Sequence, residues 1–207
     1  MSQLTILWPE GTPIPEVSHI WADYETDGND VQKGCILEAG IIYTDADLNV
    51  IAEREATLPL SAVSAARIAN VEYVHNMHSA SGLLARLHDP SVPKVTVEEL
   101  EQLILGDLEQ FGHAKRLRFC GSGSTGFDYY FTQRLMPKVG AFSSVFSQED
   151  VRYVRNHFRQ FNGGKEIPGE FHQAKTHRAI EDIRLHLAEY KAYGEVVKAG
   201  AKALNLV

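Results

Sequence analysis

The sequence contains no apolar run long enough to cross a membrane, since its most apolar stretch, residues 35–42, is interrupted by Glu38. It has only two cysteines, Cys35 and Cys120, which lie far apart and form no zinc-binding or redox motif. No lysine or arginine precedes Lys33, so the basic start of a secretory or transit leader is missing. We therefore expect free thiols in a cytoplasmic protein that does not bind membranes.

The length of 207 residues predicts a single domain, because domains commonly hold about 150 residues. Hydrophobic residues make up 44% of the chain and charged residues 23%, which excludes a disordered or fibrous protein. Three prolines within residues 1–16 indicate an extended N-terminal lead-in. Residues 17–200 are expected to form the domain and residues 201–207 a C-terminal tail.

Charge is unevenly distributed along the chain. The net charge of −7 argues against a protein that coats long nucleic acids, and residues 1–32 hold six carboxylates without a basic residue. Residues 113–160 hold eight basic residues and three acidic ones, and ten of the nineteen aromatic residues lie in residues 119–161. This basic aromatic stretch indicates either amphipathic helices with solvated faces or a surface for phosphates and bases.

Residue patterning predicts an α/β fold. Three closely connected strands form an antiparallel meander, and a capping box at Thr96 and Glu99 opens a later helix. The expected elements are strands 18–25, 35–44, 50–58, 116–120 and 141–146, and helices 96–112, 127–136, 147–161 and 178–199, with short helical pieces in residues 60–94. This order predicts a mixed sheet, in which the antiparallel three-strand meander is joined by parallel strands, flanked by helices.

Asp23 and Glu25 are two residues apart on the first predicted strand, so their side chains project from the same face. Two carboxylates side by side are unfavourable unless a cation lies between them, and a divalent metal ion is the obvious candidate. The alternative is a pair of solvated acids at an exposed strand end.

His177 and Asp182 lie near the start of the last predicted helix. If both were helical, they would point about 140° apart around the helix axis. They can face one site only if His177 lies in the loop before the helix or in a frayed first turn. The alternative is a surface histidine beside a solvated acid.

Asp128 follows a glycine-rich loop, residues 121–126, which has the GxGxxG pattern of a dinucleotide-binding site. A dinucleotide-dependent oxidoreductase is therefore one alternative function. However, too few residues follow the loop for the remaining strands of that fold, and it gives no role to the two acids of the first strand. A simple glycine-rich turn is the other alternative.

In combination, these motifs resemble the DEDDh 3′→5′ exonucleases, which have a ribonuclease H-like fold, and in particular their oligoribonuclease branch. The resemblance covers about residues 19–195. It consists of D-x-E on a first strand, an aspartate at a strand-to-helix junction in mid-chain, and H-x4-D near the C-terminus. Its supporting segments are Ile36–Asp45, His78–Leu83, Cys120–Asp128 and Thr176–Arg184.

The resemblance implies a catalytic site with four metal-binding carboxylates and His177 as the general base, since an imidazole changes its protonation state near neutral pH. The ligands would be Asp23, Glu25, Asp128 and Asp182. This all-oxygen set suits two Mg²⁺ or Mn²⁺ ions, and the reaction would release 5′-mononucleotides from short single-stranded RNA or DNA. The resemblance also implies a homodimer, and substrate binding by Tyr73, His78, Ser81, Ser124 and Asn29.

The chain departs from the family pattern at two substrate-binding positions. Family members follow D-x-E with Met-Thr-Gly-Leu, whose leucine wedges the substrate bases, whereas residues 26–29 here are Thr-Asp-Gly-Asn. The family arginine that grips the 5′ phosphate of a dinucleotide corresponds to Ser147, for which Arg152 or Arg155 are possible substitutes. A family tryptophan corresponds to Tyr73, which can still stack on a base.

These departures predict cleavage of oligonucleotides longer than two residues, with no sharp preference for dinucleotides. Arg152, Arg155 and Arg159 follow helical spacing and would track the longer backbone. An inactive exonuclease fold that binds nucleic acid or regulates another protein is the remaining alternative. It is disfavoured because all five catalytic positions are intact.

Overall fold

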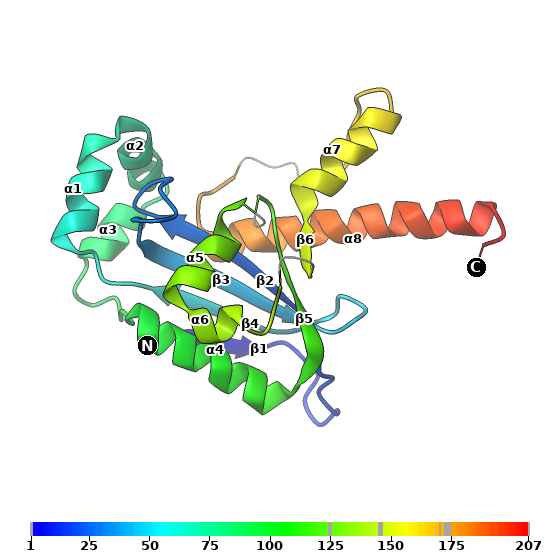
Figure 1. Cartoon of the computed structure of the whole chain (residues 1–207), viewed down its shortest axis with the longest axis horizontal. Helices are drawn as coiled ribbons and strands as arrows, with labels where there is room; N and C mark the ends of the chain where they lie inside the picture. Colours follow the sequence, from blue (N-terminus) through cyan, green and yellow to red (C-terminus); the bar gives the residue numbers. More distant parts are fainter. Residues whose placement is uncertain (1, 124–125, 145–146, 170, 172–174, 207) are drawn as a thin grey trace.

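The computed structural model describes residues 2–123, 126–144, 147–169, 171 and 175–206. Within them, a six-stranded sheet has the order β1-β4-β3-β2-β5-β6 (Figure 1). Neighbours among β1 to β4 pair antiparallel, whereas β2, β5 and β6 run parallel, which confirms the predicted mixed sheet. The strands are β1 (Gln3–Ile6), β2 (Val17–Thr26), β3 (Ile36–Thr44), β4 (Val50–Thr57), β5 (His113–Gly121) and β6 (Gln148–Asp150).

Helices cover both faces of this sheet. They are α1 (Ala62–Asn70), α2 (Glu72–Ala80), α3 (Leu83–His88), α4 (Val97–Phe111), α5 (Asp128–Leu135), α6 (Pro137–Gly140), α7 (Val151–Phe161) and α8 (Ala179–Ala203). α4, α5 and α6 lie on one face, α8 crosses the other, and α1 to α3 form a group at one side (Figure 1). The predicted capping box of α4 is present, with Thr96 and Glu99 each bonded to the other's backbone N–H.

Both faces of β2 are buried, and its residues alternate between two cores. Ile20, Ala22 and Tyr24 belong to the core shared with α4 and α5. Trp21 belongs to the core beneath α8. Because successive side chains of a strand point to opposite faces, the acids of β2 lie on the same side as Trp21, beside α8.

Gly40 on β3 allows α8 to begin directly against the sheet. Its register partner on β2 is Asp23. A Cβ atom at position 40 would collide with the backbone of Ala179 and Ile180, the first two residues of α8. The absence of a side chain at Gly40 therefore brings the start of α8 next to the acidic end of β2.

The structure differs from the predicted elements between β5 and α7. The last strand is β6, not residues 141–146, of which 145 and 146 lie outside the described residues. Parallel pairing with β5 keeps the chain extended as far as Asp150. The predicted helix 147–161 therefore begins later, after its cap Asp150, whose side chain accepts a hydrogen bond from the Arg152 N–H at 2.9 Å.

Two further features were not predicted from local patterns. β1, within the expected lead-in, is held by long-range pairing with β4. The C-terminal half of α8 projects beyond the body of the molecule (Figure 1). In the part of the chain that the structure describes, no helix combines the length and apolar character needed to cross a membrane.

Candidate active site

A hollow of about 480 Å³ lies where β2 and β5 end and α8 begins. All the side chains predicted to be catalytic line it, although they come from segments far apart in the sequence. They are Asp23, Glu25, Asp128, His177 and Asp182. Two cationic side chains, Arg152 and Lys175, stand in the same lining. The structure therefore brings the five predicted catalytic residues together.

Asp23 and Glu25 project side by side from β2, and their exposed fractions are only 9% and 6%. Burial raises the pKa of Asp23 to about 7; Lys175 opposes this rise and Asp182 adds to it. Burial, and next the charge of Asp23, raise the pKa of Glu25 to about 8. Without a cation between them, these carboxylates therefore bind protons near neutral pH.

Asp128 is the first residue of α5 and faces the acids of β2. Its Oδ1 accepts a hydrogen bond from the backbone N–H of Tyr24 at 3.0 Å. The Tyr24 hydroxyl in turn lies 2.9 Å from the hydroxyl of Thr132, one helical turn further along α5. Burial, followed by repulsion from Asp23, raises the pKa of Asp128 well above its usual value. The start of α5 is thus fixed to β2 at the site.

His177 lies before α8, which begins at Ala179, so the geometric condition for its convergence with Asp182 is met. Its φ of 54° is in the left-handed region, which is uncommon for residues other than glycine and asparagine. Potential ligand atoms of Glu25, His177 and Asp182 all lie within 4.8 Å of one another. His177 is therefore placed to act either on a bound water or as a metal ligand.

Asp182 also holds the segment that carries His177. Its Oδ1 accepts hydrogen bonds from the Thr176 backbone N–H at 3.2 Å and from the Thr176 hydroxyl at 3.3 Å. A single carboxylate therefore belongs to the acidic cluster and orients the histidine segment as well.

Glu38 anchors the same segment from the sheet, a role that the sequence did not reveal. It is fully buried on β3 and accepts a hydrogen bond from the Ala179 N–H at 3.1 Å, at the start of α8. The guanidinium of Arg178 binds the Glu38 carboxylate at 2.8–3.2 Å. The available signal was an acid in the middle of an apolar strand, which needs a buried partner.

Two buried histidines lie behind the acids of β2. We expected His78 to bind substrate, but it is fully buried, with Nε2 2.8 Å from the Thr26 carbonyl oxygen and Nδ1 3.7 Å from Glu25. It therefore supports Glu25 from behind the hollow. The Nδ1 of His186 on α8 lies 3.8 Å from Asp23, and burial lowers the pKa of His186 to about 3. His186 lies one helical turn after Asp182, so helical spacing could have placed both side chains on the same face of the helix.

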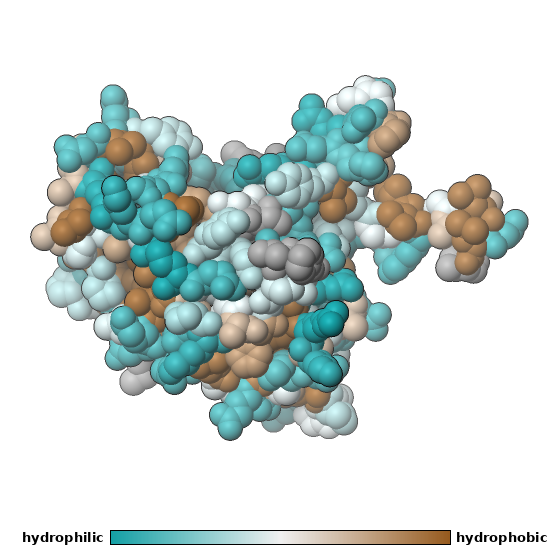
Figure 2. Space-filling model, in the orientation of Figure 1, coloured by the Kyte–Doolittle hydropathy of each residue, from teal (hydrophilic) through white to brown (hydrophobic). Residues whose placement is uncertain are grey.

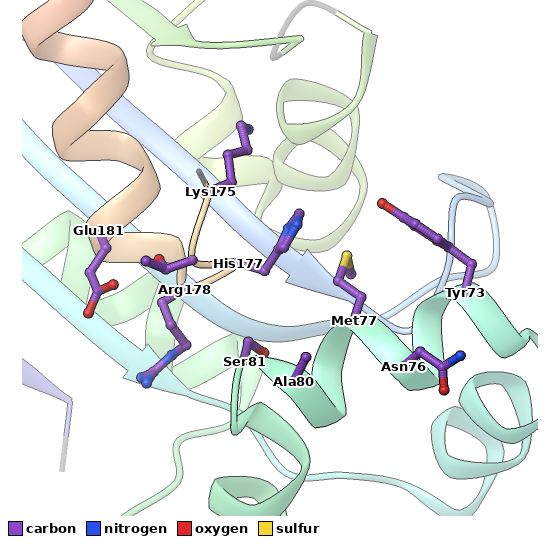
Figure 3. Close-up of a pocket in the computed structure, with 10 residues that line it drawn as sticks. Tyr73, Asn76, Met77, Ala80, Ser81, Lys175, His177, Arg178 and Glu181 are labelled. Atoms are coloured by element: carbon purple, nitrogen blue, oxygen red, sulfur yellow. The ribbon is translucent and has the colours of Figure 1, made fainter. Parts of the chain in front are cut away.

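A second hollow, of about 640 Å³, adjoins the first and is lined by two of the predicted substrate-binding residues, Tyr73 and Ser81 (Figure 3). Tyr73 is 68% exposed, and its ring extends from α2 toward His177. Because Lys175 and His177 line both hollows, the two are continuous at these residues.

The loop after β2 places two of its polar side chains, Asp27 and Asn29, differently. Asn29 lines the first hollow. Asp27 is buried and points away, because its carboxylate binds Arg67 at 2.9 Å and accepts a hydrogen bond from the Cys35 N–H at 2.7 Å. Asp27 therefore fixes the loop and is not part of the acidic cluster. Ser124, the remaining predicted substrate contact, lies outside the described residues.

Two of the three arginines predicted to follow the substrate have acidic partners in the structure. Arg155 binds Glu189 on α8, with Nε 2.6 Å from Oε1, and Arg159 binds Glu166 at 3.0 Å. Of the three α7 arginines, Arg152 alone lines the first hollow. Helical spacing correctly placed the arginines on one helix but could not show which of them have acidic partners on other segments.

The donor set of the first hollow fits Mg²⁺ or Mn²⁺. Its described lining contains four carboxylates and no thiol, a combination that hard divalent cations prefer over zinc. Two of these carboxylates have pKa values raised toward or above neutrality by burial, so a cation would relieve an electrostatic cost that is already present.

This cost leads to a prediction for the metal-free protein. Burial raises the pKa of Glu25 from 4.5 to about 8, so the folded state binds the proton more tightly and loses stability as the pH rises from about 5 to 8. Glu25→Gln removes this dependence. In EDTA at pH 8, we expect the Glu25→Gln variant to melt about 5 °C above the unmodified protein. At pH 5 the difference in melting temperature should be much smaller.

The matched control is Glu181→Gln, which changes an exposed acid on α8. Melting curves at both pH values, followed by circular dichroism, provide the measurement. An equal gain at pH 5 and pH 8 would show that the Glu25 carboxylate is not under electrostatic strain in the folded protein.

Comparison with solved structures identifies the fold. Exonuclease I of E. coli, in a complex with single-stranded DNA, matches with a TM-score of 0.58 over 85% of this chain at 14% identity. Exonuclease I of Methylocaldum szegediense matches with a TM-score of 0.55 over 83% at 20% identity. This chain spans about two fifths of the length of those chains, 40% and 39%. The fold is the ribonuclease H-like fold of the DEDD-type exonucleases, as predicted.

No family model matches the chain. The oligoribonuclease of Francisella tularensis subsp. novicida (strain U112) is 33% identical over 176 residues, which cover 84% of this chain and 92% of that protein. The oligoribonuclease of Vibrio cholerae serotype O1 (strain O395) is 31% identical over 181 residues, covering 86% and 94%. The chain belongs to the oligoribonuclease family and is a 3′→5′ exonuclease.

The oxidoreductase alternative is therefore wrong. The glycine-rich loop connects β5 to α5 in a mixed sheet, not in the doubly wound parallel sheet of that class. Its Gly123 N–H donates a hydrogen bond to the Asp150 carboxylate at 3.0 Å, and the loop leads to Asp128 at the acidic hollow.

Proposed function

We propose that this chain hydrolyses short single-stranded oligonucleotides from the 3′ end, with Mg²⁺ or Mn²⁺, and releases 5′-mononucleotides. The observation that carries the proposal is the convergence of four carboxylates and His177 in one hollow. The name oligoribonuclease of its relatives favours short RNA, whereas solved exonuclease I complexes contain DNA oligonucleotides. Both types of nucleic acid are therefore candidate substrates.

The ligands of two divalent ions would be Asp23, Glu25, Asp128 and Asp182. The chemistry that such ions supply when bound is activation of the attacking water and stabilisation of charge on the scissile phosphate and the leaving oxygen. His177 would accept the proton of the attacking water, and the Thr176–Asp182 hydrogen bonds would hold it in position.

The second hollow suits the 3′-terminal nucleoside. Tyr73 offers an exposed ring on which a base can stack, and its ring extends toward His177 across the opening. Ser81 supplies a hydroxyl in the same hollow, and Asn29 a polar side chain beside the acids. Since the acids are buried at the end of a strand, the 3′ end must be unpaired to reach them, and duplexes should be poor substrates.

The decisive experiment is digestion of matched RNA and DNA oligomers, from two to about twenty nucleotides, with Mg²⁺, with Mn²⁺ and with EDTA. We expect metal-dependent release of mononucleotides from the 3′ end. Binding of oligomers without release would instead support the inactive-fold alternative.

Substrate length is the point at which this chain and the family pattern differ. Asn29 replaces the apolar wedge, and Ser147 stands where the family has a phosphate-gripping arginine. We therefore predict comparable kcat/KM values for 5′-phosphorylated dimers and heptamers. Arg152, in the lining of the first hollow, supplies a contact for a backbone phosphate beyond the terminal nucleotide.

The measurement compares the two substrates for the protein and for Asn29→Leu, which restores an apolar residue at the wedge position. The variant should gain preference for the dimer. A hundredfold advantage of the dimer in the unmodified protein would contradict this interpretation of Asn29 and Ser147.

We also propose a homodimer in the cytoplasm. The projecting half of α8 and the residues after it expose the apolar side chains of Val196, Val197, Leu204 and Leu206. Brown atoms are visible at this projecting end in Figure 2. Such a surface is typical of an interface. Light scattering after size exclusion should give twice the chain mass, and the Val197→Glu variant should give the mass of one chain.

The free thiols Cys35 and Cys120 suit a reducing compartment.

A further inference from the structure

Lys175 is a cation within the acidic site that the sequence did not single out. Its side chain lines both hollows, and its Nζ lies 4.0 Å from Oδ2 of Asp182. Burial raises the pKa values of Asp23 and Glu25, and the positive charge of Lys175 opposes that rise. The charge of Lys175 is therefore felt across the carboxylate cluster.

The geometry of Lys175 differs from that of the structural cations in this chain. Arg155 and Arg178 bind their buried acids at hydrogen-bond distance, 2.6 Å in one case and 2.8 Å in the other. The 4.0 Å contact between Lys175 and Asp182 is longer than a charge-assisted hydrogen bond. Moreover, 48% of the Lys175 side chain is exposed, against 2% for Asp182. Lys175 is therefore not locked to its acid and can reach a ligand in the hollow.

The position of Lys175 matches the position of the reacting group. If the terminal nucleoside lies beside Tyr73 in the second hollow, its phosphate lies at the junction with the first hollow, which Lys175 and His177 line. We propose that Lys175 is a further catalytic residue, which donates a hydrogen bond to a non-bridging oxygen of the scissile phosphate. This inference rests on the proposed function.

The step is the hydrolysis of one phosphodiester bond. The water oxygen forms a bond to phosphorus, and the bond from phosphorus to the 3′-oxygen of the preceding nucleotide breaks, with its electron pair going to that oxygen. His177 takes a proton from the water, and the departing 3′-oxygen gains a proton from solvent. Negative charge increases on the phosphoryl group during this exchange, and the ammonium of Lys175 stabilises it.

The test uses Lys175→Met, which removes the charge, and Lys175→Arg, which keeps it. The control is Lys115→Met, an exposed lysine near the opposite end of β5. Hydrolysis of a 5′-labelled heptamer is measured with saturating Mn²⁺, and Mn²⁺ affinity is measured separately by electron paramagnetic resonance. Melting curves confirm that each variant is folded.

Lys175→Met should lower kcat by about 10- to 100-fold, the range expected on losing one donor to a developing oxyanion at a half-exposed position. The same variant should bind Mn²⁺ about fivefold more tightly, because a positive charge about 4 Å from a ligand is removed. Lys115→Met should keep full activity, and Lys175→Arg should be more active than Lys175→Met because it retains the positive charge. This opposite response of turnover and metal affinity is the signature of the proposed role.

A structural lysine would produce a different result. If Lys175→Met lost Mn²⁺ affinity together with activity, Lys175 would be holding the carboxylates in place, and the proposal would be overturned. Unchanged turnover would overturn it as well. Failure of the unmodified protein to release mononucleotides in the same assay would refute the proposed function itself, so the two failures are distinguishable.

Discussion

Replacing Asp23 with asparagine is expected to slow mononucleotide release by roughly a thousandfold, since loss of an ionic metal ligand removes several kcal/mol of transition-state stabilisation. The substitution keeps the size of the side chain but removes its charge. In the metal-free protein the charge of Asp23 is buried and is repelled by neighbouring carboxylates. Because the substitution removes this unfavourable charge, the metal-free variant should remain folded. The measurements are kcat/KM with Mg²⁺ and Mn²⁺, and the melting temperature in EDTA.

The matched control is Asp47→Asn, an exposed acid in the turn between β3 and β4, which should keep full activity. Glu25→Gln, Asp128→Asn and Asp182→Asn should resemble Asp23→Asn in activity. Full activity in any two of the four site variants would show that the assignment of the ligands is wrong.

The second large effect is expected at His177. Asparagine is the least disruptive replacement, because it tolerates the left-handed backbone conformation that His177 adopts. His177→Asn should reduce kcat by about 10² to 10⁴, the usual contribution of a positioned general base, while Mn²⁺ affinity is largely retained.

His75→Asn, an exposed histidine on α2, is the control for this measurement. A large loss of Mn²⁺ affinity in His177→Asn would identify His177 as a ligand, a role that its distance to Glu25 and Asp182 also permits. Unchanged turnover would transfer the role of base to another residue.

The sequence predicted the order of the main elements and the placement of individual side chains on them because both depend on short-range patterns. The i, i+2 spacing on a strand placed Asp23 and Glu25 on one face, and the cap at Thr96 placed the start of α4. The argument that His177 must precede the helix also followed from helical geometry alone. The conclusion that these segments meet came from the resemblance, because no local pattern specifies contacts between distant segments.

The features that the sequence missed all depend on such distant contacts. β1 is defined by its pairing with β4, and the end of β6 by its pairing with β5. Glu38 and His186 act through buried partners on other elements. Lys175 is identified as part of the site only by its distance to Asp182. His78 was assigned to the substrate because its motif lies beside Ser81, but burial turned its side chain toward Glu25.

The start of α8 supplies Lys175, His177 and Asp182, and it rests on β3 at Gly40 and Glu38. During synthesis on the ribosome, β2 and its acids are made before this segment. A nascent chain that has not reached residue 177 holds three of the four carboxylates and lacks the histidine. Under the proposed assignment, chains that end before residue 177 are expected to release no mononucleotides, so the site is assembled only after the start of α8 has joined the sheet.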